Sequence, residues 1–588
     1  MADPTLQGLL SLLEVQPAFQ ALVADLSRGQ LAPGEEPLAL NLPGAARPFV
    51  AAGLADHLRR PVLVVTARPE TALQMQAPME QFRPPEIPIL NFPDPGALPY
   101  ERAPWSRDRV QRRIAALTAL RVAAEEGSDA PAPIIVTSAR ALLHPTIPAD
   151  LFKRYTRTYA VGEQRSLKFL IASWYAMGYT STTMVLEPGQ YAQRGGILDI
   201  FPLNSSSPVR IELWGDDIDS IRAFDPISQR SERQLQRVVV PPASEALLHR
   251  TSEQAAERLG ALSLEGLAEG VPEEFREEFR QIEAGERFSK LEFFLPYLYS
   301  QPASLFDHLP EGSLRLVEDW NSLLLNIEQV ETEAMRLRED LVGRGELPAE
   351  FEGALFTWDD LRDIFSQQPP LLLGFGDVGG YELGEQFTVG ESYGGRLHDA
   401  IQKMRAARDA GTTQLLLSRQ AERMMELLRS EGIDSAVQQS EIASAPPPGS
   451  LVVVNSALAE GFELRAVPDA ESDLARQPFS LITDNELFGW SRTVSRRPMR
   501  ARRRKGSDLF DEITEGSHVV HIEHGIGIYR GLVQREVGGV TREYLYLEYD
   551  HGDKLFVPVH QADRVVKYLG PDGREPRVHR LGTGDWES

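Results

Sequence analysis

The 588-residue chain contains no cysteine, which excludes disulfide bonds, thiolate metal ligands and a thiol nucleophile. It also has no run of about 18 apolar residues, the length that a membrane-spanning helix needs. The N-terminus lacks the basic segment and apolar stretch of a secretory signal. We therefore expect a cytoplasmic protein without a membrane partner.

Lysine is scarce, since only seven of the 61 basic residues are lysines. A phosphate-binding P-loop has the pattern G-x-x-x-x-G-K-[ST], in which the lysine reaches the phosphates and the hydroxyl binds Mg²⁺. None of the seven lysines follows a glycine, and none precedes serine or threonine. The sequence therefore predicts no P-loop of this form.

A strand–turn–helix junction still occurs where a P-loop would lie. Residues 37–42 are strand-like and residues 48–58 are helical, and a helix N-terminus in this position can bind phosphate. Arg47 is not assumed to replace the missing lysine, because its planar guanidinium recognises phosphate differently. We predict a degenerate loop that binds no nucleotide, made of Gly44, Ala45, Ala46 and Arg47.

No other pattern predicts a catalytic or metal-binding residue. His518, His521 and His524 have a three-residue spacing, but residues three apart on a strand point to opposite faces. No spacing of a nucleophile and a base stands out. We therefore predict no catalytic residue, no metal site and no cofactor in this chain.

The length suggests roughly four domains at about 150 residues each, and we predict a multidomain α/β protein. The first α/β domain is predicted at 1–148, with a helix at 109–124 and strands at 61–66, 87–91 and 134–137. Two-residue alternation predicts a small, mainly antiparallel insert at 149–240. A helical segment at 241–345 and a second α/β domain at 346–488 follow, the latter with strands near 371–375, 414–418, 451–454 and 479–483.

A β-rich module is predicted at 513–575, followed by a tail at 576–588. The Gly-Gly pair between Val537 and Val540 favours a hairpin turn. Alternation places Leu545, Leu547 and Tyr549 on one face of a strand. With a short closing helix at 563–569, we expect a five-stranded barrel of the SH3 or Tudor type.

A basic linker is predicted at 489–512. The net charge of −24 opposes binding of the whole chain to nucleic acid, but residues 491–505 carry eight positive charges and no acid. These residues could contact DNA phosphates, pair with the chain's own acidic surface, or form a solvated linker. The candidates for DNA contact are Arg502, Arg503, Arg504 and Lys505.

Two groups of motifs resemble known domains. The stretches GQYAQRGGILDIFP (189–202) and VRIELWGDDIDSIRAFD (209–225) resemble the domain shared by UvrB and the bacterial transcription-repair coupling factors, the Mfd family. The C-terminal stretches HVVHIEHGIGIY (518–529), YLYLEY (544–549) and KLFVPV (554–559) resemble that family's RNA polymerase-interacting module, which also occurs in CarD-type regulators. Both motifs in this order point to the coupling factors.

The resemblance implies a UvrB-like, degenerate RecA-type α/β domain, which the helical segment completes, and an insert that binds UvrA. An arginine suits such an interface because its guanidinium pairs with carboxylates and stacks on aromatic rings. We rank Arg194 first among the UvrA-binding candidates, followed by Arg210, Tyr191 and Phe201. In the alternative interpretation Arg194 is a solvated turn residue and Phe201 a core residue.

The resemblance also implies that the C-terminal module binds the β subunit of RNA polymerase through an edge strand near 528–537. Such an edge can extend a partner's sheet by main-chain hydrogen bonds. The candidates are Leu532, Val533, Arg535 and Glu536, of which Leu532 and Val533 could instead be core. At Arg535 the chain departs from the apolar residue that we align in better-known members.

In the family an ATP-driven DNA translocase follows the polymerase module, and this chain ends at Ser588. We therefore expect the N-terminal part of such a protein, a monomeric and non-enzymatic recruitment platform in which ATP and Mg²⁺ serve only the absent motor. Two alternatives remain open: an ATP-dependent DNA-repair helicase of the UvrB type, and a CarD-like transcription regulator.

Overall fold

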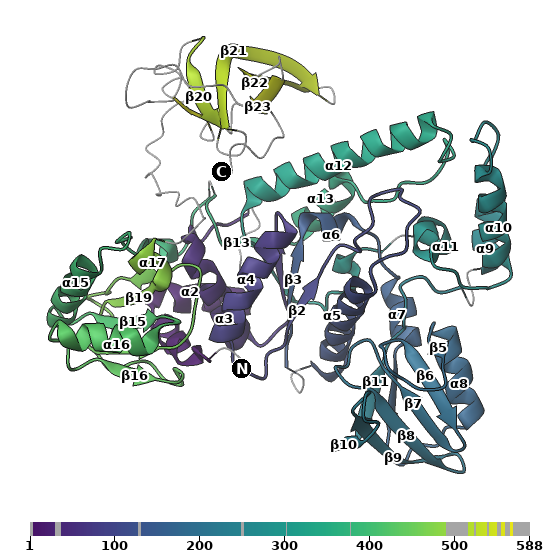
Figure 1. Cartoon of the computed structure of the whole chain (residues 1–588), viewed down its shortest axis with the longest axis horizontal. Helices are drawn as coiled ribbons and strands as arrows, with labels where there is room; N and C mark the ends of the chain where they lie inside the picture. Colours follow the sequence, from purple (N-terminus) through teal and green to yellow (C-terminus); the bar gives the residue numbers. More distant parts are fainter. Residues whose placement is uncertain are drawn as a thin grey trace. The chain divides into compact units, whose positions relative to one another are not determined.

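The structure is a computed structural model, and it describes residues 4–29, 37–127, 131–248, 252–301, 303–376, 378–489, 515–521, 525–537, 540–549, 554–558 and 565–567. The chain divides into two compact units, 1–493 and 494–588 (Figure 1). His524, the tail at 576–588 and the candidates Arg502, Arg503, Arg504 and Lys505 lie outside the described residues.

The first unit is built on a parallel five-stranded sheet with the order β13-β12-β1-β3-β2. Its strands are β1 (Val62–Thr66), β2 (Ile89–Phe92), β3 (Ile134–Ser138), β12 (Leu314–Val317) and β13 (Leu371–Leu372). Val62 and Val64 pack with α3 (Arg47–Leu58) and α4 (Pro69–Phe82), whereas Leu63 and Val65 pack with α5 (Arg107–Glu126) and α6 (Ala139–Leu143). Both faces are covered, so the strands are continuous apolar runs.

The predicted strands at 61–66, 87–91 and 134–137 and the helices at 48–58 and 109–124 are confirmed within a few residues. The strand-like stretch at 37–42 forms no strand. Ala39 makes isolated bridges to Leu372 and Gly379, and Leu40 donates a backbone hydrogen bond to Leu372. This stretch therefore lies beside the edge of the first sheet without joining it as a regular strand.

Two strands of the first sheet come from unexpected places. The apolar run near 371–375 was predicted for the second α/β domain, but β13 is the edge strand of the first sheet. Strand β12 lies inside the segment that was predicted to be helical. A short apolar run looks the same in either sheet, because its partner is chosen by long-range pairing.

The insert between β3 and β12 is mainly antiparallel, as predicted. Strand β4 (Arg157–Ala160) pairs with β11 (Arg237–Val240). Helix α8 (Leu167–Ala176) lies along a six-stranded sheet (Figure 1), where Trp174 packs against Tyr191 with ring centroids 5.8 Å apart. In the order β10-β9-β8-β7-β6-β5, the strands of this sheet are Ser231–Leu235, Asp217–Phe224, Val209–Trp214, Ile197–Ile200, Gln190–Arg194 and Thr180–Ser181.

Helices dominate the segment after the insert. They are α9 (Ser252–Gly260), α10 (Val271–Glu283), α11 (Leu295–Leu298) and α12 (Trp320–Gly343). Helix α13 (Trp358–Gln367) follows them, and α7 (Ala149–Tyr155) begins the insert. Among the described residues no single helix is long and apolar enough to cross a membrane. The N-terminal segments Gln7–Glu14 and Pro17–Arg28 pass that test only as a pair bent by 89°, and their leucines are buried.

The second α/β domain has a six-stranded sheet with the order β14-β18-β19-β15-β17-β16. The predicted strands at 414–418, 451–454 and 479–483 are confirmed as β15 (Thr413–Leu417), β17 (Leu451–Val454) and β19 (Phe479–Thr483). The others are β14 (Phe387–Val389), β16 (Val437–Gln439) and β18 (Phe462–Leu464), and the helices are α14 (Leu383–Gln386), α15 (Leu397–Asp409), α16 (Ala421–Ser430) and α17 (Asp484–Phe488). Phe49 of α3 lies 5.2 Å from Phe462 between ring centroids, so the two α/β domains share a core.

The second unit is an antiparallel five-stranded sheet with the order β23-β22-β21-β20-β24. Leu545, Leu547 and Tyr549 are all buried, which confirms the predicted apolar face. The helix predicted at 563–569 is wrong, because Val565–Lys567 is a strand paired with β20. Closure into a barrel stays a prediction. The strands are β20 (His518–His521), β21 (Gly525–Val537), β22 (Val540–Glu548), β23 (Lys554–Pro558) and β24 (Val565–Lys567).

Candidate functional site

The degenerate loop forms a 3₁₀ turn, Gly44–Ala46, that leads directly into α3. The first helical residue, Arg47, is 9% exposed. Its Nε donates to the carbonyl oxygen of Leu42 at 3.2 Å, and its Nη1 pairs with the carboxylate of Glu318, the residue after β12. Burial raises the pKa of Glu318, although Arg47 opposes the rise. The guanidinium is therefore already committed to internal acceptors.

The guanidinium of Arg47 lies close to the chain that follows β13, and there is more room beside Gly44. A methyl group on Gly374, just after β13, would lie 3.0 Å from Nη2 of Arg47. A methyl group on Gly44 would lie 3.9 Å from the carboxylate oxygen Oε2 of Glu460. Phosphate binding needs cations and N–H groups that face open space. The guanidinium of Arg47, paired with Glu318, does not offer that, and the loss of nucleotide binding at this turn stays a prediction.

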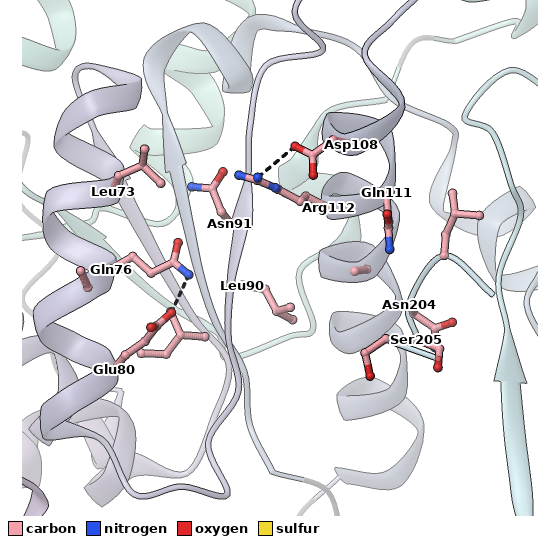
Figure 2. Close-up of a pocket in the computed structure, with 15 residues that line it drawn as sticks. Leu73, Gln76, Glu80, Leu90, Asn91, Asp108, Gln111, Arg112, Asn204 and Ser205 are labelled. Carbon is pink, nitrogen blue, oxygen red and sulfur yellow. Dashed lines mark hydrogen bonds and ion pairs between the residues drawn. The ribbon is translucent and has the colours of Figure 1, made fainter. Parts of the chain in front are cut away.

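A shallow groove of about 620 Å³ lies along the edge strand β2. Figure 2 shows Gln76 and Glu80 on α4 facing Asp108 and Arg112 on α5 across the strand. Gln76 donates to Glu80 at 2.8 Å, and Arg112 pairs with Asp108 at 2.9 Å. Each of the two pairs lies within one helix, Oε1 of Gln76 has no hydrogen-bond partner, and none of the four residues forms a pair of nucleophile and base. In the described ranges no cluster of three or more histidines and carboxylates could hold a metal.

Arg194 lies at the end of β6, where a turn at Gly195 and Gly196 leads into β7. Gly195 has a φ of 63°, which favours glycine at this turn. The Arg194 side chain is exposed, and its Nη2 donates to the carbonyl oxygen of Thr183 at 3.5 Å. The first-ranked candidate is thus exposed, at the end of a strand and directly before a turn.

Arg210 is committed to an internal pair. Its Nε and Nη2 donate to the two carboxylate oxygens of Asp199 at 2.7 and 2.9 Å. Its guanidinium carbon lies 4.7 Å from the ring centroid of Phe224. The hydrogen bond to Asp199 raises the pKa of Arg210. Arg210 therefore orders the outer face of the sheet, defined here as the face opposite α8.

Tyr191 and Phe201 are not surface residues, which corrects their assignment as partner contacts. Tyr191 is 5% exposed on the face covered by α8. Phe201 is 6% exposed in a cluster with Val185, Ala192 and Phe224, so the alternative that it is core is confirmed. The sequence reasoning missed that the loop 182–187 covers part of the outer face. It also missed Met184, Leu186 and Ile227, which are exposed at 43%, 52% and 89%.

In the C-terminal module only part of β21 has a free edge. Ile528 pairs with His518 on one side and with Glu548 on the other. The stretch from Leu532 to Val537 pairs with β22, and no described strand pairs with its other side. A β-bulge between Tyr529 and Leu532 contains Gly531, whose φ is 109°. The free edge is therefore shorter than the predicted 528–537.

Leu532 is 46% exposed, although the residue opposite it, Leu545, is buried. The alternative that Leu532 is a core residue is therefore wrong. Val533 is half-buried opposite Tyr544. Arg535 and Glu536 lie on the same strand, and their side chains lie outside the described residues.

Comparisons with known proteins match both motif regions. The sequence model of the family described as UvrB interaction domain matches residues 158–245, and that of the CarD-like/TRCF RID domain matches residues 513–569.

The chain is also similar to curated proteins named transcription-repair-coupling factor. It is 31% identical to the one from Mycobacterium tuberculosis (strain CDC 1551 / Oshkosh) over 633 residues, which cover 100% of this chain and 48% of the relative. It is 26% identical to the one from Bacillus subtilis (strain 168), over 97% of this chain and 48% of the relative. For the one from Escherichia coli (strain K12) the identity is 26%, over 94% of this chain and 47% of the relative. The chain spans about half the length of these relatives.

Proposed function

We infer that the chain belongs to the transcription-repair-coupling factor family, and we propose that it is a recruitment platform that joins RNA polymerase to the excision-repair protein UvrA. The observation that carries the proposal is the order of two interaction domains, 158–245 and 513–569, in a chain that aligns with coupling factors over nearly its whole length. A CarD-like regulator needs only the second domain.

UvrA binds the insert on its outer face, with Arg194 at the centre. The exposed guanidinium of Arg194 can donate paired hydrogen bonds to a carboxylate. Arg210 contributes indirectly, because its pair with Asp199 holds β7 and β8 in register.

The β subunit of RNA polymerase binds the free edge of β21. The stretch from Leu532 to Val537 has main-chain groups on its outer side with which a strand of the partner can pair. Leu532 supplies the exposed apolar contact. A contact of this size buries less than about 1,200 Å² and is of modest affinity.

The chain itself has no ATPase role in this proposal. The pair formed by Arg47 and Glu318 lies at the N-terminus of α3, where a P-loop would bind phosphate, and no lysine occurs in the loop 44–47. This argues against a helicase of the UvrB type.

The experiment measures binding of the purified chain to UvrA and to RNA polymerase, with and without Mg-ATP. We expect both partners to bind in either condition. Arg194→Glu should weaken only UvrA binding, and Leu532→Glu only polymerase binding, so each variant is the control for the other. A chain that captures neither partner would overturn the proposal.

A further inference from the structure

The insert carries an unusual share of the exposed large apolar side chains. Six of the fourteen in the described residues lie within 158–245, the part of the insert region that matches the UvrB interaction domain. Two of the six, Phe169 and Tyr175, lie on α8. Three others, Met184, Leu186 and Ile227, belong to loops that meet on the outer face of the sheet. Isolated exposed apolar residues are normal, whereas a cluster indicates an interface.

Two loops bring these three residues together. In the loop 182–187, Val185 inserts into the cluster of Ala192, Phe201 and Phe224, which leaves its neighbours Met184 and Leu186 exposed. In the turn between β9 and β10, Gln229 donates from Nε2 to the carbonyl oxygen of Val185 at 3.4 Å. Ile227 lies two residues before Gln229 in this turn, so this hydrogen bond keeps Ile227 near the first loop.

Both loops are held by hydrogen bonds. The backbone N–H groups of Leu186 and Glu187 donate to Oε1 of Gln190 at 2.9 and 3.1 Å. The N–H of Ser228 donates to Oδ1 of Asp225 at 2.6 Å. A surface ordered before binding loses less conformational entropy when a partner arrives. The backbone of the loops that carry Met184, Leu186 and Ile227 is therefore held in place by hydrogen bonds.

Arg194 joins this cluster through its contact with Thr183, the residue before Met184. Its neighbours on the outer face are neutralised, since Arg210 pairs with Asp199 and Arg222 with Glu212. In the ranges that the structure covers, no carboxylate forms an ion pair with Arg194. The outer face therefore offers Arg194, an exposed cation without an ion pair in the described residues, beside three apolar side chains.

We propose that Met184, Leu186 and Ile227 form, with Arg194, one docking surface for a protein face that places a carboxylate beside apolar side chains. The inference rests on the proposed function and identifies this face as that of UvrA. Arg194 receives the carboxylate, and the apolar side chains exclude water from the pair. Charge pairs bind more strongly when neighbouring contacts exclude water.

The test compares UvrA binding by calorimetry for four variants of the whole chain. We expect Met184→Ser/Leu186→Ser and Ile227→Ser each to weaken binding at least about tenfold, as expected when contacts of about 1.4 kcal/mol are lost. Tyr175→Ser is the matched control, because Tyr175 is 70% exposed on α8, on the opposite face. It should leave binding unchanged. Thermal melting shows that the variants remain folded.

Two results would separate the inference from the proposed function. If Arg194→Glu loses UvrA while both apolar variants bind as wild type does, the apolar surface is wrong and the recruitment function stands. If the wild-type chain does not bind UvrA, both are overturned. Equal losses in Tyr175→Ser and Ile227→Ser would also overturn the inference, because the effect would then not be specific to the outer face.

Discussion

Arg113 and Glu245 are separated by 132 residues and form a bidentate ion pair whose two side chains have no exposed area. The nitrogen–oxygen distances are 2.6 and 2.8 Å. Arg113 belongs to α5, and Glu245 ends the segment that matches the UvrB interaction domain. Thr146 also donates to the Glu245 carboxylate, at 2.5 Å. The pair therefore fastens the end of the insert to the first α/β domain.

Glu245→Gln should strongly destabilise the first unit. The substitution leaves the guanidinium of Arg113 buried without its counter-charge, which typically costs about 3–5 kcal/mol. Urea unfolding followed by circular dichroism measures the loss as a lower midpoint. Replacing both residues, as Arg113→Met/Glu245→Gln, should recover part of it, because no charge then stays buried. A single variant as stable as wild type would contradict the role of the pair.

Stability should fall in mildly acidic solution because of two buried histidines. Burial lowers the pKa of His144 well below its ordinary value, with smaller effects of Arg113 and Arg140, and burial also lowers the pKa of His308. The unfolded chain therefore binds more protons, and stability is lost as the pH falls below about 6.5. Melting temperatures recorded between about pH 7.5 and 5.5 test this.

The variant that tests the role of the buried imidazole is His144→Phe. It should flatten the dependence of the melting temperature on pH. Equal slopes in wild type and His144→Phe would show that acid acts through other groups.

Local patterns predicted most elements, and they failed where distant segments meet. The run at β1 could be identified because every residue is apolar, as a buried parallel strand requires. The same reasoning could not assign Leu371 to the first sheet. Its partner Leu316 is 55 residues away, and the pattern of a strand does not specify with which other strand it pairs.

The candidate site residues also differ in whether the local sequence or a contact with another strand decides their role. The motif at 189–202 contains Arg194, which was ranked first among the candidates, and its side chain is exposed at the end of β6. Arg210 was ranked second, but its ion pair with Asp199 depends on the register of β7 with β8, which the sequence does not specify. The outer apolar residues were missed because Val185, between Met184 and Leu186, is apolar too, and no alternation separates them.

Asp199→Asn should affect UvrA binding through stability. It weakens the paired hydrogen bonds to Arg210, which should cost about 1–3 kcal/mol. Arg194→Glu removes a solvent-exposed contact and should leave the melting temperature unchanged while binding is lost. Calorimetry together with thermal melting separates the two effects. If Asp199→Asn lost binding without any change in melting, Arg210 would contact UvrA directly.

Gly531→Ala should weaken polymerase binding by distorting the bulge before the free edge. The φ of 109° is unfavourable for alanine, and the strain should cost about 1–3 kcal/mol. Hydrogen exchange of the whole chain with polymerase should show protection at 532–537 in wild type and less in the variant. Gly516→Ala is the control, because it also has a positive φ but lies outside β21. Protection confined to other strands would contradict docking at this edge.

Mg-ATP should leave the melting temperature of this chain unchanged. Arg47 is already paired with Glu318, and a ligand held at a concentration one hundred times its Kd would stabilise the folded state by about 2.7 kcal/mol. A shift of that size is easily measured by calorimetry.

Arg47→Met should destabilise the first unit and Arg47→Met/Glu318→Gln should do so less, because the single variant leaves a buried carboxylate without its partner. In both variants, as in wild type, Mg-ATP should leave the melting temperature unchanged. A Mg²⁺-dependent rise in the wild-type melting temperature that Arg47→Met abolishes would show that the guanidinium binds phosphate after all.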